Sequence, residues 1–316
     1  MFNHLTYKKT LEGIPFFSED RYWGKARKED LEKALRVIEE KGWDEFKAIY
    51  GGKFDFTFEY NRADWRFPVP LSKNSVVLDL GAGMGRTSIP IAMVAGKVVA
   101  VDQSFLRMKF LKKIAEREGF QNIEVYVGDL FDLPFPEDSF DLIVMNGVLE
   151  WVGMTERFKD PREAQIAALS ICKKMLKKGG YLYIGIENRF ALSYLRGVDH
   201  SGLRFTNYMP RFMANWYMHL RKGRPYNTYT YNVHGYQKLL REVGFDRPDF
   251  YLVYPGYNNP RITIPYKDLH ILSYVVQTLM PENSLLRKLL KRLAGLPLTL
   301  RMYRKLFFSF NIFVQK

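Results

Sequence analysis

The chain has 316 residues and is 47% hydrophobic, which excludes a disordered chain and allows one large domain or one domain with added segments. It holds no run of 18 apolar residues and no apolar leader near its start, so we expect neither a membrane-spanning helix nor a signal peptide. Cys172 is the single cysteine, which excludes an internal disulfide and favours a cytoplasmic protein.

The net charge of +14 lies entirely in the second part of the chain. Residues 1–188 hold 28 Lys and Arg against 28 Asp and Glu, whereas residues 189–316 hold 20 against 6. A one-sided positive field attracts anions, which here means phosphorylated small molecules, nucleic acid or acidic lipid. The alternative interpretation is a basic surface that only keeps the protein in solution.

A helical N-terminal extension is predicted over residues 1–70, because apolar side chains recur at helical spacing between residues 29 and 40. Strands and helices then alternate over residues 71–188, which indicates a doubly wound, mostly parallel α/β sheet of the Rossmann-like class. The predicted strands of this core are residues 76–80, 97–101, 123–127, 142–145 and 181–186. Helices are expected near residues 89–92 and over 105–118 and 162–177.

The alternation is interrupted twice after residue 188. Residues 189–232 are rich in aromatic residues and arginine and predict an insertion that covers the substrate. The core continues over residues 233–256, with a helix at 233–243 and a strand at 250–254. Residues 257–306 predict a second, basic and mostly helical insertion. Residues 307–316 are the last core segment, with a strand expected at 307–314.

The strongest motif is the glycine-rich turn after the first core strand, VVLDLGAGMGR at residues 76–86. Gly81, Gly83 and Gly85 follow Asp79 and let the backbone approach a ligand closely. Arg86 stands where the dinucleotide fingerprint has its third glycine, which argues against a dehydrogenase.

Two further acids end the next two strands. Asp102, followed by Gln103, can accept hydrogen bonds from the vicinal hydroxyls of a ribose. Asp129 can accept the exocyclic amine of an adenine, and the amide of Leu130 can donate to the ring. Asp132 is interpreted as a turn residue.

These three motifs, with FDLIVMNGVLEWV at residues 140–152, resemble the class I S-adenosylmethionine-dependent methyltransferases over roughly residues 70–255. The resemblance implies S-adenosyl-L-methionine as cofactor and a seven-stranded sheet whose last strand is reversed, beside residues 250–254. It implies the three glycines near the methionine moiety, Asp102 at the ribose, and Asp129 with Leu130 at the adenine. Asn146 would lie near the sulfonium and the acceptor. A finer likeness, to methyltransferases associated with cell-envelope glycans, rests on segments such as GIENRF at 185–190.

Many small-molecule members of that family carry a histidine where this chain has Trp151, so their histidine base cannot be assumed. Methyl transfer needs alignment of donor and acceptor, and an oxygen acceptor also needs a base. His200 is the base candidate, with an idle loop histidine as the alternative; Glu187 and Asn146 complete the catalytic set. Candidate substrate-binding residues, which otherwise pair or pack on the surface, are Arg189, Arg204, Tyr229 and Tyr231. The remaining histidines show no ligand spacing, so no metal is expected.

Residues 285–293, LLRKLLKRL, place leucines on one helix face and cations on the other. Seven cations lie between Arg287 and Lys305, and residues 283–316 contain no acid. Such a segment associates with an anionic membrane surface, or it is a packed cover helix with a solvated basic face.

The sequence favours a methyltransferase acting on an oxygen or nitrogen of a small or medium molecule, such as a sugar or a lipid-linked envelope component. The basic second part supports a tRNA or rRNA methyltransferase as the alternative, although no separate RNA-binding module is recognisable. A third hypothesis is a non-catalytic cofactor-binding protein. We expect a cytoplasmic location, with peripheral membrane contact if residues 283–306 bind lipid.

Overall fold

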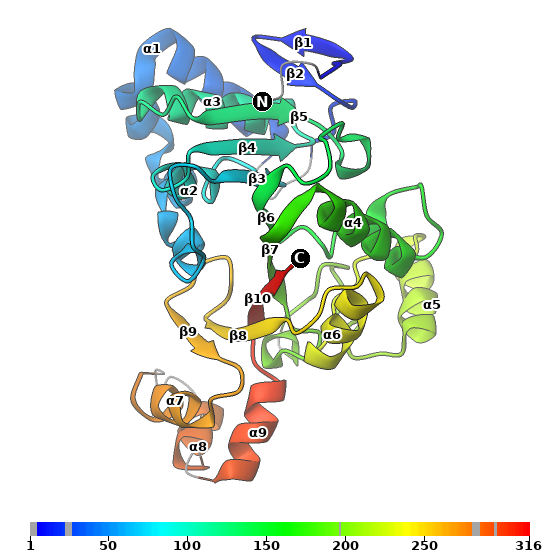
Figure 1. Cartoon of the computed structure of the whole chain (residues 1–316). Coiled ribbons are helices and arrows are strands. Elements are labelled where there is room, and N and C mark those ends of the chain that lie inside the picture. Colours follow the sequence, from blue (N-terminus) through cyan, green and yellow to red (C-terminus); the bar gives the residue numbers. More distant parts are fainter. Residues whose placement is uncertain (1–4, 23–26, 196, 280–284, 294–295) are drawn as a thin grey trace. The chain divides into compact units, whose positions relative to one another are not determined.

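The computed structural model describes residues 5–22, 27–195, 197–279, 285–293 and 296–316 (Figure 1). The small parts of the expected N-terminal extension and of the two insertions that fall between these ranges lie outside the described residues. Two compact units make up the chain. The first unit is Met1–Asn146, Ile171–Leu182 and Lys316, and the second is Gly147–Ser170 and Tyr183–Gln315. Within the described residues, no helix is long and apolar enough to cross a bilayer.

The first unit contains the part of the sheet that runs from β1 to the first half of β7. Its strands are β1 (Lys9–Leu11), β2 (Ile14–Phe16), β3 (Val76–Leu80), β4 (Lys97–Asp102), β5 (Ile123–Val127), β6 (Phe140–Asn146) and the first half of β7 (Leu176–Glu187). They lie in the order β1-β2-β5-β4-β3-β6-β7, and β3 to β6 pair in parallel. All five residues of β3 are buried, as an interior parallel strand requires.

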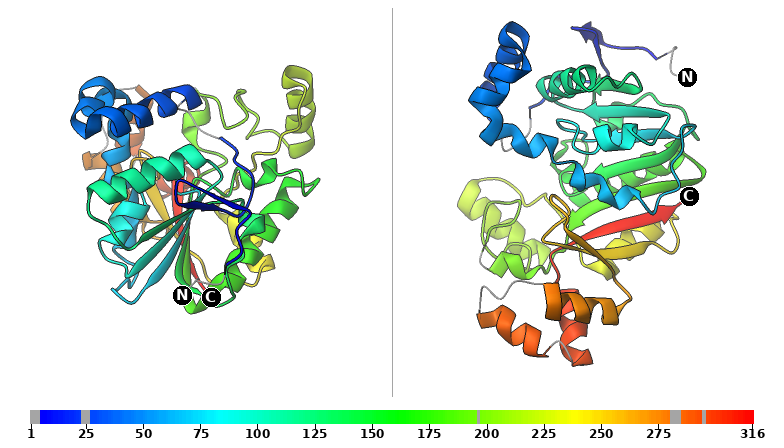
Figure 2. Two further views of the ribbon diagram at one scale, coloured as in Figure 1. Left: turned by 90° about the horizontal axis from the view of Figure 1, so that it is seen from above. Right: turned by 90° about the vertical axis from the view of Figure 1, so that its left-hand side faces the viewer.

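Helices cover this half of the sheet. They are α1 (Lys28–Phe54), α2 (Ser88–Ala92) and α3 (Phe105–Arg117), with short 3-10 turns η1 (Asp55–Phe58), η2 (Tyr60–Arg66) and η3 (Leu130–Asp132). Figure 2 shows α1 and α3 on the same side of the strands. The apolar stripe of α1, which includes Leu31 and Phe46, shares one buried cluster with Phe110 of α3. Helix α1 is longer than expected and bends at Gly42, where φ is 86°.

The N-terminal residues are not purely helical, in contrast to the expectation for residues 1–70. Strands β1 and β2 form a hairpin, and Phe16 of β2 pairs with Val127 of β5. The amide of Phe17 continues the ladder by donating to the Val127 carbonyl at 2.8 Å. These strands escape detection because each is three residues long, too short to show an alternating pattern.

The second unit contains the remaining strands, in the order β7-β10-β8-β9. They are the second half of β7, β8 (Asp249–Tyr254), β9 (Ile262–Pro265) and β10 (Ser309–Gln315). Its helical elements are η4 (Val152–Met154), η5 (Leu192–Leu195), α5 (Arg211–Lys222), α6 (Val233–Glu242), α7 (Leu269–Tyr274), the π-helical η6 (Val275–Leu279), α8 (Leu285–Leu293) and α9 (Pro297–Lys305). Helix α4 (Pro161–Met175) passes from the second unit into the first.

The reversed last strand is confirmed: β10 runs antiparallel to β8, with Ile312 opposite Phe250. The described residues contain ten strands rather than the expected seven, because β1, β2 and β9 add to the family sheet. Strand β7 begins at Leu176, earlier than expected, and runs through both glycines at 179 and 180. Gly180 permits this because a Cβ there would lie only 3.0 Å from the Phe140 carbonyl oxygen.

Candidate functional site

The glycine-rich turn joins β3 to α2 in the first unit. Gly81, Gly83 and Gly85 all have positive φ, which other residues adopt only with strain. Asp79 precedes them and is buried; its carboxylate accepts hydrogen bonds from the hydroxyls of Thr87 and Ser88, both at 2.6 Å. Burial raises the pKa of Asp79 to about 6, although the two hydroxyls oppose the shift. Through these contacts, Asp79 stabilises the glycine-rich turn.

Asp102, at the end of β4, braces the same turn. One carboxylate oxygen accepts the amide of Gly83 at 3.0 Å and the other accepts the amide of Ser104 at 2.9 Å. Each oxygen keeps a further lone pair, so both are able to accept from a bound ribose. A side chain on Gly83 would meet open space, since the nearest atom to its Cβ would be the Gly81 carbonyl oxygen at 4.0 Å. The turn therefore leaves room for a ligand against its backbone.

Asp129 follows β5, and its carboxylate has two hydrogen-bond donors. Its carboxylate accepts from Gln103 Nε2 at 2.8 Å and from the Phe131 amide at 2.9 Å. Its own amide donates to Ser18 Oγ at 2.8 Å. Leu130 begins the short turn η3 and is half-buried. Ser18 was not recognisable from the sequence, because it belongs to no motif and reaches this turn only through the β2–β5 pairing.

Asn146 ends β6 at the same edge of the sheet. The register pairs Leu80 with Met145 and with Val101, so the residues that follow β3, β4 and β6 are neighbours there. The Asn146 side chain is 5% exposed, and neither its amide oxygen nor its nitrogen has a hydrogen-bond partner among the described residues. A buried amide without partners is costly unless a ligand satisfies it. The open Gly83 backbone and this amide fit a polar cofactor such as S-adenosylmethionine.

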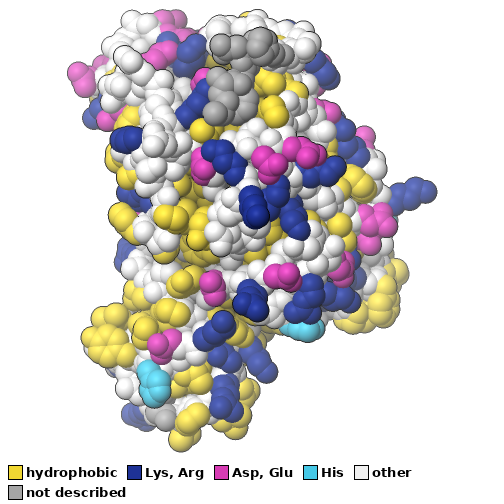
Figure 3. All heavy atoms as spheres, viewed as in Figure 1, with side chains coloured by type: hydrophobic (Ala, Val, Ile, Leu, Met, Phe, Trp, Pro, Cys, Tyr) yellow, Lys and Arg dark blue, Asp and Glu magenta, His cyan; other side chains and the backbone are white. Residues whose placement is uncertain are grey.

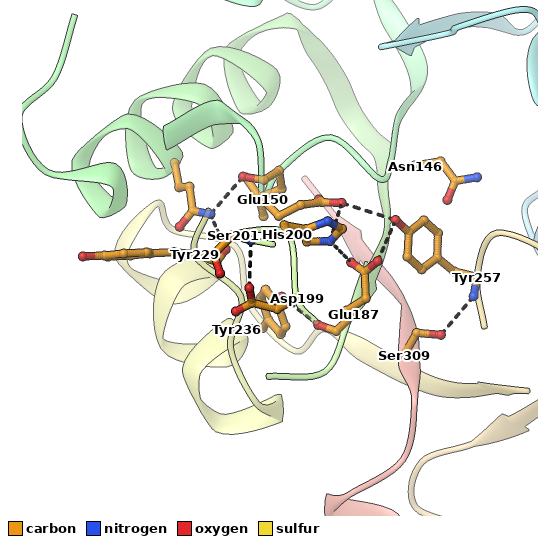
Figure 4. A network of polar contacts seen from close by, with 12 residues as sticks. Asn146, Glu150, Glu187, Asp199, His200, Ser201, Tyr229, Tyr236, Tyr257 and Ser309 are labelled. Atoms are coloured by element: carbon orange, nitrogen blue, oxygen red, sulfur yellow. Dashed lines mark hydrogen bonds and ion pairs between the residues drawn. The ribbon is translucent and has the colours of Figure 1, made fainter. Parts of the chain in front are cut away.

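A second polar cluster, in the second unit, brings His200 to two glutamates (Figure 4). His200 Nε2 lies 3.1 Å from Glu187 Oε2 and 3.8 Å from Glu150 Oε1. Glu187 ends β7, whereas Glu150 lies four residues after Asn146 and is completely buried. The sequence indicated His200 and Glu187 but gave no reason to choose Glu150. We name these three residues the His200 cluster.

Tyr257 joins the two glutamates from the loop after β8. Its hydroxyl lies 3.3 Å from Glu150 Oε1 and 3.2 Å from Glu187 Oε1. Gly147 makes room for this ring, since a Cβ there would lie 2.7 Å from the Tyr257 hydroxyl. Trp151 packs against His200, with the two ring centroids 4.7 Å apart. The sequence gave no signal for Tyr257, which is 107 residues from Glu150.

The ionisation of the cluster departs from ordinary values. Burial lowers the pKa of His200, but the hydrogen bond and charge of Glu187, with the charges of Glu150 and Asp199, overcome it and raise the pKa to about 9. Burial, followed by repulsion from Glu187, raises the pKa of Glu150 to about 8. At pH 7 these pKa values keep His200 protonated and Glu150 neutral. Because the two groups lie in one buried cluster, their protons titrate as a coupled set.

The cluster also has the spacing of a metal site. The candidate ligand atoms of Glu150, Glu187 and His200 lie within 4.8 Å of one another, which a divalent cation could bridge. This was not foreseen, because the sequence spacing of the histidines suggested no metal. Because His200 and Glu150 hold protons at pH 7, a cation would have to displace these protons to bind.

The loop that carries His200 is tied down by Asp199 and Lys222. The Asp199 carboxylate accepts the Ser201 amide and the Thr206 hydroxyl, both at 2.7 Å. Lys222, at the end of α5, donates to the Ser201 carbonyl at 2.7 Å. His200 is thus fixed from both sides by its sequence neighbours.

The four residues expected to bind substrate have different surroundings. Arg189 donates to the carbonyls of Asn207 and Met209 at 2.6 and 2.7 Å, so the guanidinium fastens its own insertion. The Tyr229 ring lies 4.0 Å from the guanidinium carbon of Arg211, and the Tyr231 hydroxyl donates to Gln165 at 3.0 Å. Arg204 is exposed. Of the four, Arg204 keeps the most freedom to meet a substrate.

A methyltransferase-domain family matches residues 71–232, which is half of the chain. The chain belongs to this methyltransferase family. The family is described as a methyltransferase domain, in agreement with the α/β sheet of the first unit.

Individual relatives cover only parts of the chain. An uncharacterized protein of Methanocaldococcus jannaschii is 30% identical over 144 residues, which are 44% of this chain and 60% of the relative. A malonyl-[acyl-carrier protein] O-methyltransferase of Methylococcus capsulatus is 30% identical over 122 residues, 38% of this chain and 40% of that protein. The match thus spans less than two thirds of these relatives.

Among solved structures, a phosphoethanolamine N-methyltransferase of Haemonchus contortus, in complex with phosphomonomethylethanolamine and S-adenosylhomocysteine, is similar at a TM-score of 0.48. It is 16% identical, and the alignment covers 89% of this chain and 59% of that one.

Proposed function

We propose that this methyltransferase binds S-adenosylmethionine along the polar edge of the first unit and transfers its methyl group to an oxygen or nitrogen of a small or medium acceptor. The unpartnered, buried amide of Asn146, together with the open backbone at Gly83, is the observation that supports this most directly. Asp102 would hold the ribose, and Asp129 with Leu130 the adenine. The sulfonium of the bound cofactor supplies the electrophilic methyl group and a good leaving group.

His200 is proposed as the base that takes the proton of the acceptor, with Glu187 as the residue that orients it. The Glu187 carboxylate holds the imidazole ring in place, but it also keeps the ring protonated at neutral pH. Because imidazole acts as a base only when neutral, only the deprotonated fraction of His200 would be active. Glu150, neutral at pH 7, would donate its proton to the Tyr257 hydroxyl, which in turn donates to Glu187 Oε1. In this proposal Trp151 forms the wall against which the imidazole is positioned.

The acceptor is proposed to be a sugar or a lipid-linked molecule that carries an acidic group, for which Arg204 is the available cation. One relative, an O-methyltransferase of a carrier-bound malonyl group, supports an oxygen acceptor only as a class. A basic, apolar surface at residues 283–306 would bring the enzyme to an anionic membrane. Leu285, Leu298 and Met302 are 85%, 71% and 58% exposed there.

The test is transfer of a labelled methyl group from S-adenosylmethionine to fractions of a cell extract. We expect label in a small-molecule or lipid fraction, and His200→Ala to lower turnover by roughly 10²–10⁴ while cofactor affinity stays the same. His270→Ala, which removes an exposed histidine of α7, is the matched control. Full activity of His200→Ala would overturn the proposed base, and label in tRNA or rRNA would favour the nucleic-acid alternative.

A further inference from the structure

Helix α5 exposes apolar side chains to an unusual extent for a soluble domain. Phe212, Trp216 and Leu220 are 75%, 67% and 66% exposed, and Met213 beside them is 45% exposed. The first three stand at positions i, i+4 and i+8, so they form one continuous stripe along the helix. Figure 3 shows apolar side chains gathered over this part of the surface. We name these four residues the α5 stripe.

The stripe is not a misplaced core face. The opposite side of α5 is properly packed: Ala214 and Met218 are buried in a cluster with Tyr226. The helix also has a well-formed end, where Gly223 adopts the left-handed conformation at φ 64°. Since α5 has one buried face and one exposed apolar face, its outer face is available to a partner.

The charges around the stripe select the kind of partner. Residues 200–241 contain seven Lys and Arg and no Asp or Glu. Arg221 and Lys222, in the last turn of α5, are exposed, and Arg204 is exposed on the preceding loop. Asp199, the nearest acid before them, is turned inward onto Ser201 and Thr206. The surface is therefore apolar in its centre and positive at its margin.

We infer that α5 inserts into the interface of an anionic lipid bilayer, with the α5 stripe among the acyl chains and Arg221 at the headgroups. A tryptophan beside aromatic and aliphatic residues, flanked by cations, is the composition of an interfacial helix. This contact is additional to the membrane contact proposed for residues 283–306. The two proposals share only the anionic lipid as ligand.

The position of α5 gives this contact a role at the active site. Lys222 of α5 binds the carbonyl of Ser201, next to His200, and Arg211 at the other end stacks on Tyr229. A bilayer that holds α5 therefore holds the loop that carries the proposed base. An acceptor with a lipid tail would be presented to this loop from the membrane surface.

The experiment uses the full chain and extruded vesicles of either neutral phosphatidylcholine or a mixture containing anionic phosphatidylglycerol, followed by sedimentation at low and high salt. Phe212→Ser/Trp216→Ser/Leu220→Ser should weaken binding to anionic vesicles by roughly tenfold or more, as expected for losing three inserted side chains. Ile49→Ser/Met93→Ser removes exposed apolar residues of the first unit and should bind like the unmodified chain. Brominated lipids should quench the fluorescence of Trp216, measured as the difference between the unmodified chain and Trp216→Phe.

The outcomes separate this inference from the proposed function. Unchanged vesicle binding by the triple variant, together with loss of binding by Lys288→Glu/Arg292→Glu, would overturn the role of α5 and leave residues 283–306 as the membrane contact. If the unmodified chain is a dimer in solution and the triple variant is a monomer, the α5 stripe binds a second copy of the chain, and the membrane role of α5 is overturned. If the unmodified chain binds tRNA tightly and the triple variant does not, the membrane role of α5 is also overturned. Methyl transfer to a soluble acceptor should not change in the triple variant, so loss of catalysis and loss of membrane binding are read separately.

Discussion

The imidazole of His200 packs against the indole of Trp151, with ring centroids 4.7 Å apart and an interplanar angle of 60°. Trp151 occupies the position at which many small-molecule members of the family were expected to carry a histidine. The imidazole is thus absent from the segment after β6 but is supplied beside it by the loop at residues 199–206. The proposed proton acceptor thus comes from a different segment of the chain. Glu187, which is distant from Trp151 in sequence, orients it.

The dependence of catalysis on pH tests this arrangement. With a pKa of about 9, only about one His200 in a hundred is neutral at pH 7, so kcat/KM should rise with pH and level off above about pH 9. Glu187→Gln removes the charge and the acceptor that raise this pKa, and the rising limb should move to lower pH by at least about one unit. Glu163→Gln, an exposed change on α4, should leave the limb in place. If the rising limb of the pH profile does not move in Glu187→Gln, His200 is not the base.

Cofactor affinity should depend on Asp102. Asp102→Ala removes the acceptor that holds the Gly83 amide and that is expected to meet the ribose, so S-adenosylmethionine binding should weaken by about 1–3 kcal/mol. Titration calorimetry measures this directly, with Glu137→Ala as an exposed acidic control. Equal affinities for Asp102→Ala and the unmodified chain would place the ribose elsewhere.

Stability should fall as the pH rises from 5 to 9. The pKa of His200 is higher in the folded state, so its stabilisation is complete below its unfolded pKa of 6.5 and is lost as the pH passes through about 9. Glu150 acts in the same direction, because the folded chain holds its proton up to about pH 8 whereas an unfolded chain releases it near 4.5.

The measurement is Tm across this pH range, for the unmodified chain and for Glu150→Gln. The variant cannot lose a proton at this position, so its Tm should fall less between pH 5 and 8. Identical profiles would show that Glu150 does not change its ionisation in that range.

Metal removal is expected to have no effect. His200 and Glu150 already hold protons at pH 7, and a cation would have to displace them. Dialysis against a chelator should therefore leave turnover and Tm unchanged, and added Mg²⁺, Mn²⁺ or Zn²⁺ should not raise either. Loss of activity on chelation, with recovery on adding one of these ions, would show that Glu150, Glu187 and His200 are metal ligands.

The sequence was a good guide where function depends on local pattern. The buried run of β3, the glycines after it and the acids that end β4 and β5 lie at fixed spacings, and these placed the proposed cofactor residues on one edge. The antiparallel pairing of β10 with β8 was also predictable, from the family sheet and from the apolar character of residues 307–314.

The parts that escaped prediction depend on contacts between distant segments. Glu150 and Tyr257 meet only because a loop after β8 reaches back across 107 residues, and neither belongs to a motif. Arg189 was expected to bind substrate because it follows a strand at the ligand edge and its guanidinium can bind a carboxylate or phosphate. No pattern shows that the carbonyls of Asn207 and Met209 occupy its guanidinium.

The place of β10 has a consequence for how the protein is made. This strand lies between β7 and β8, although residues 309–315 are synthesised more than fifty residues after β8. Until residues 309–315 leave the ribosome, β8 and β9 pair only with each other among the strands described here, and a two-stranded ribbon is marginal in water. The second unit must therefore fold late, whereas the central strands of the first unit are complete by residue 146 and are able to fold during synthesis.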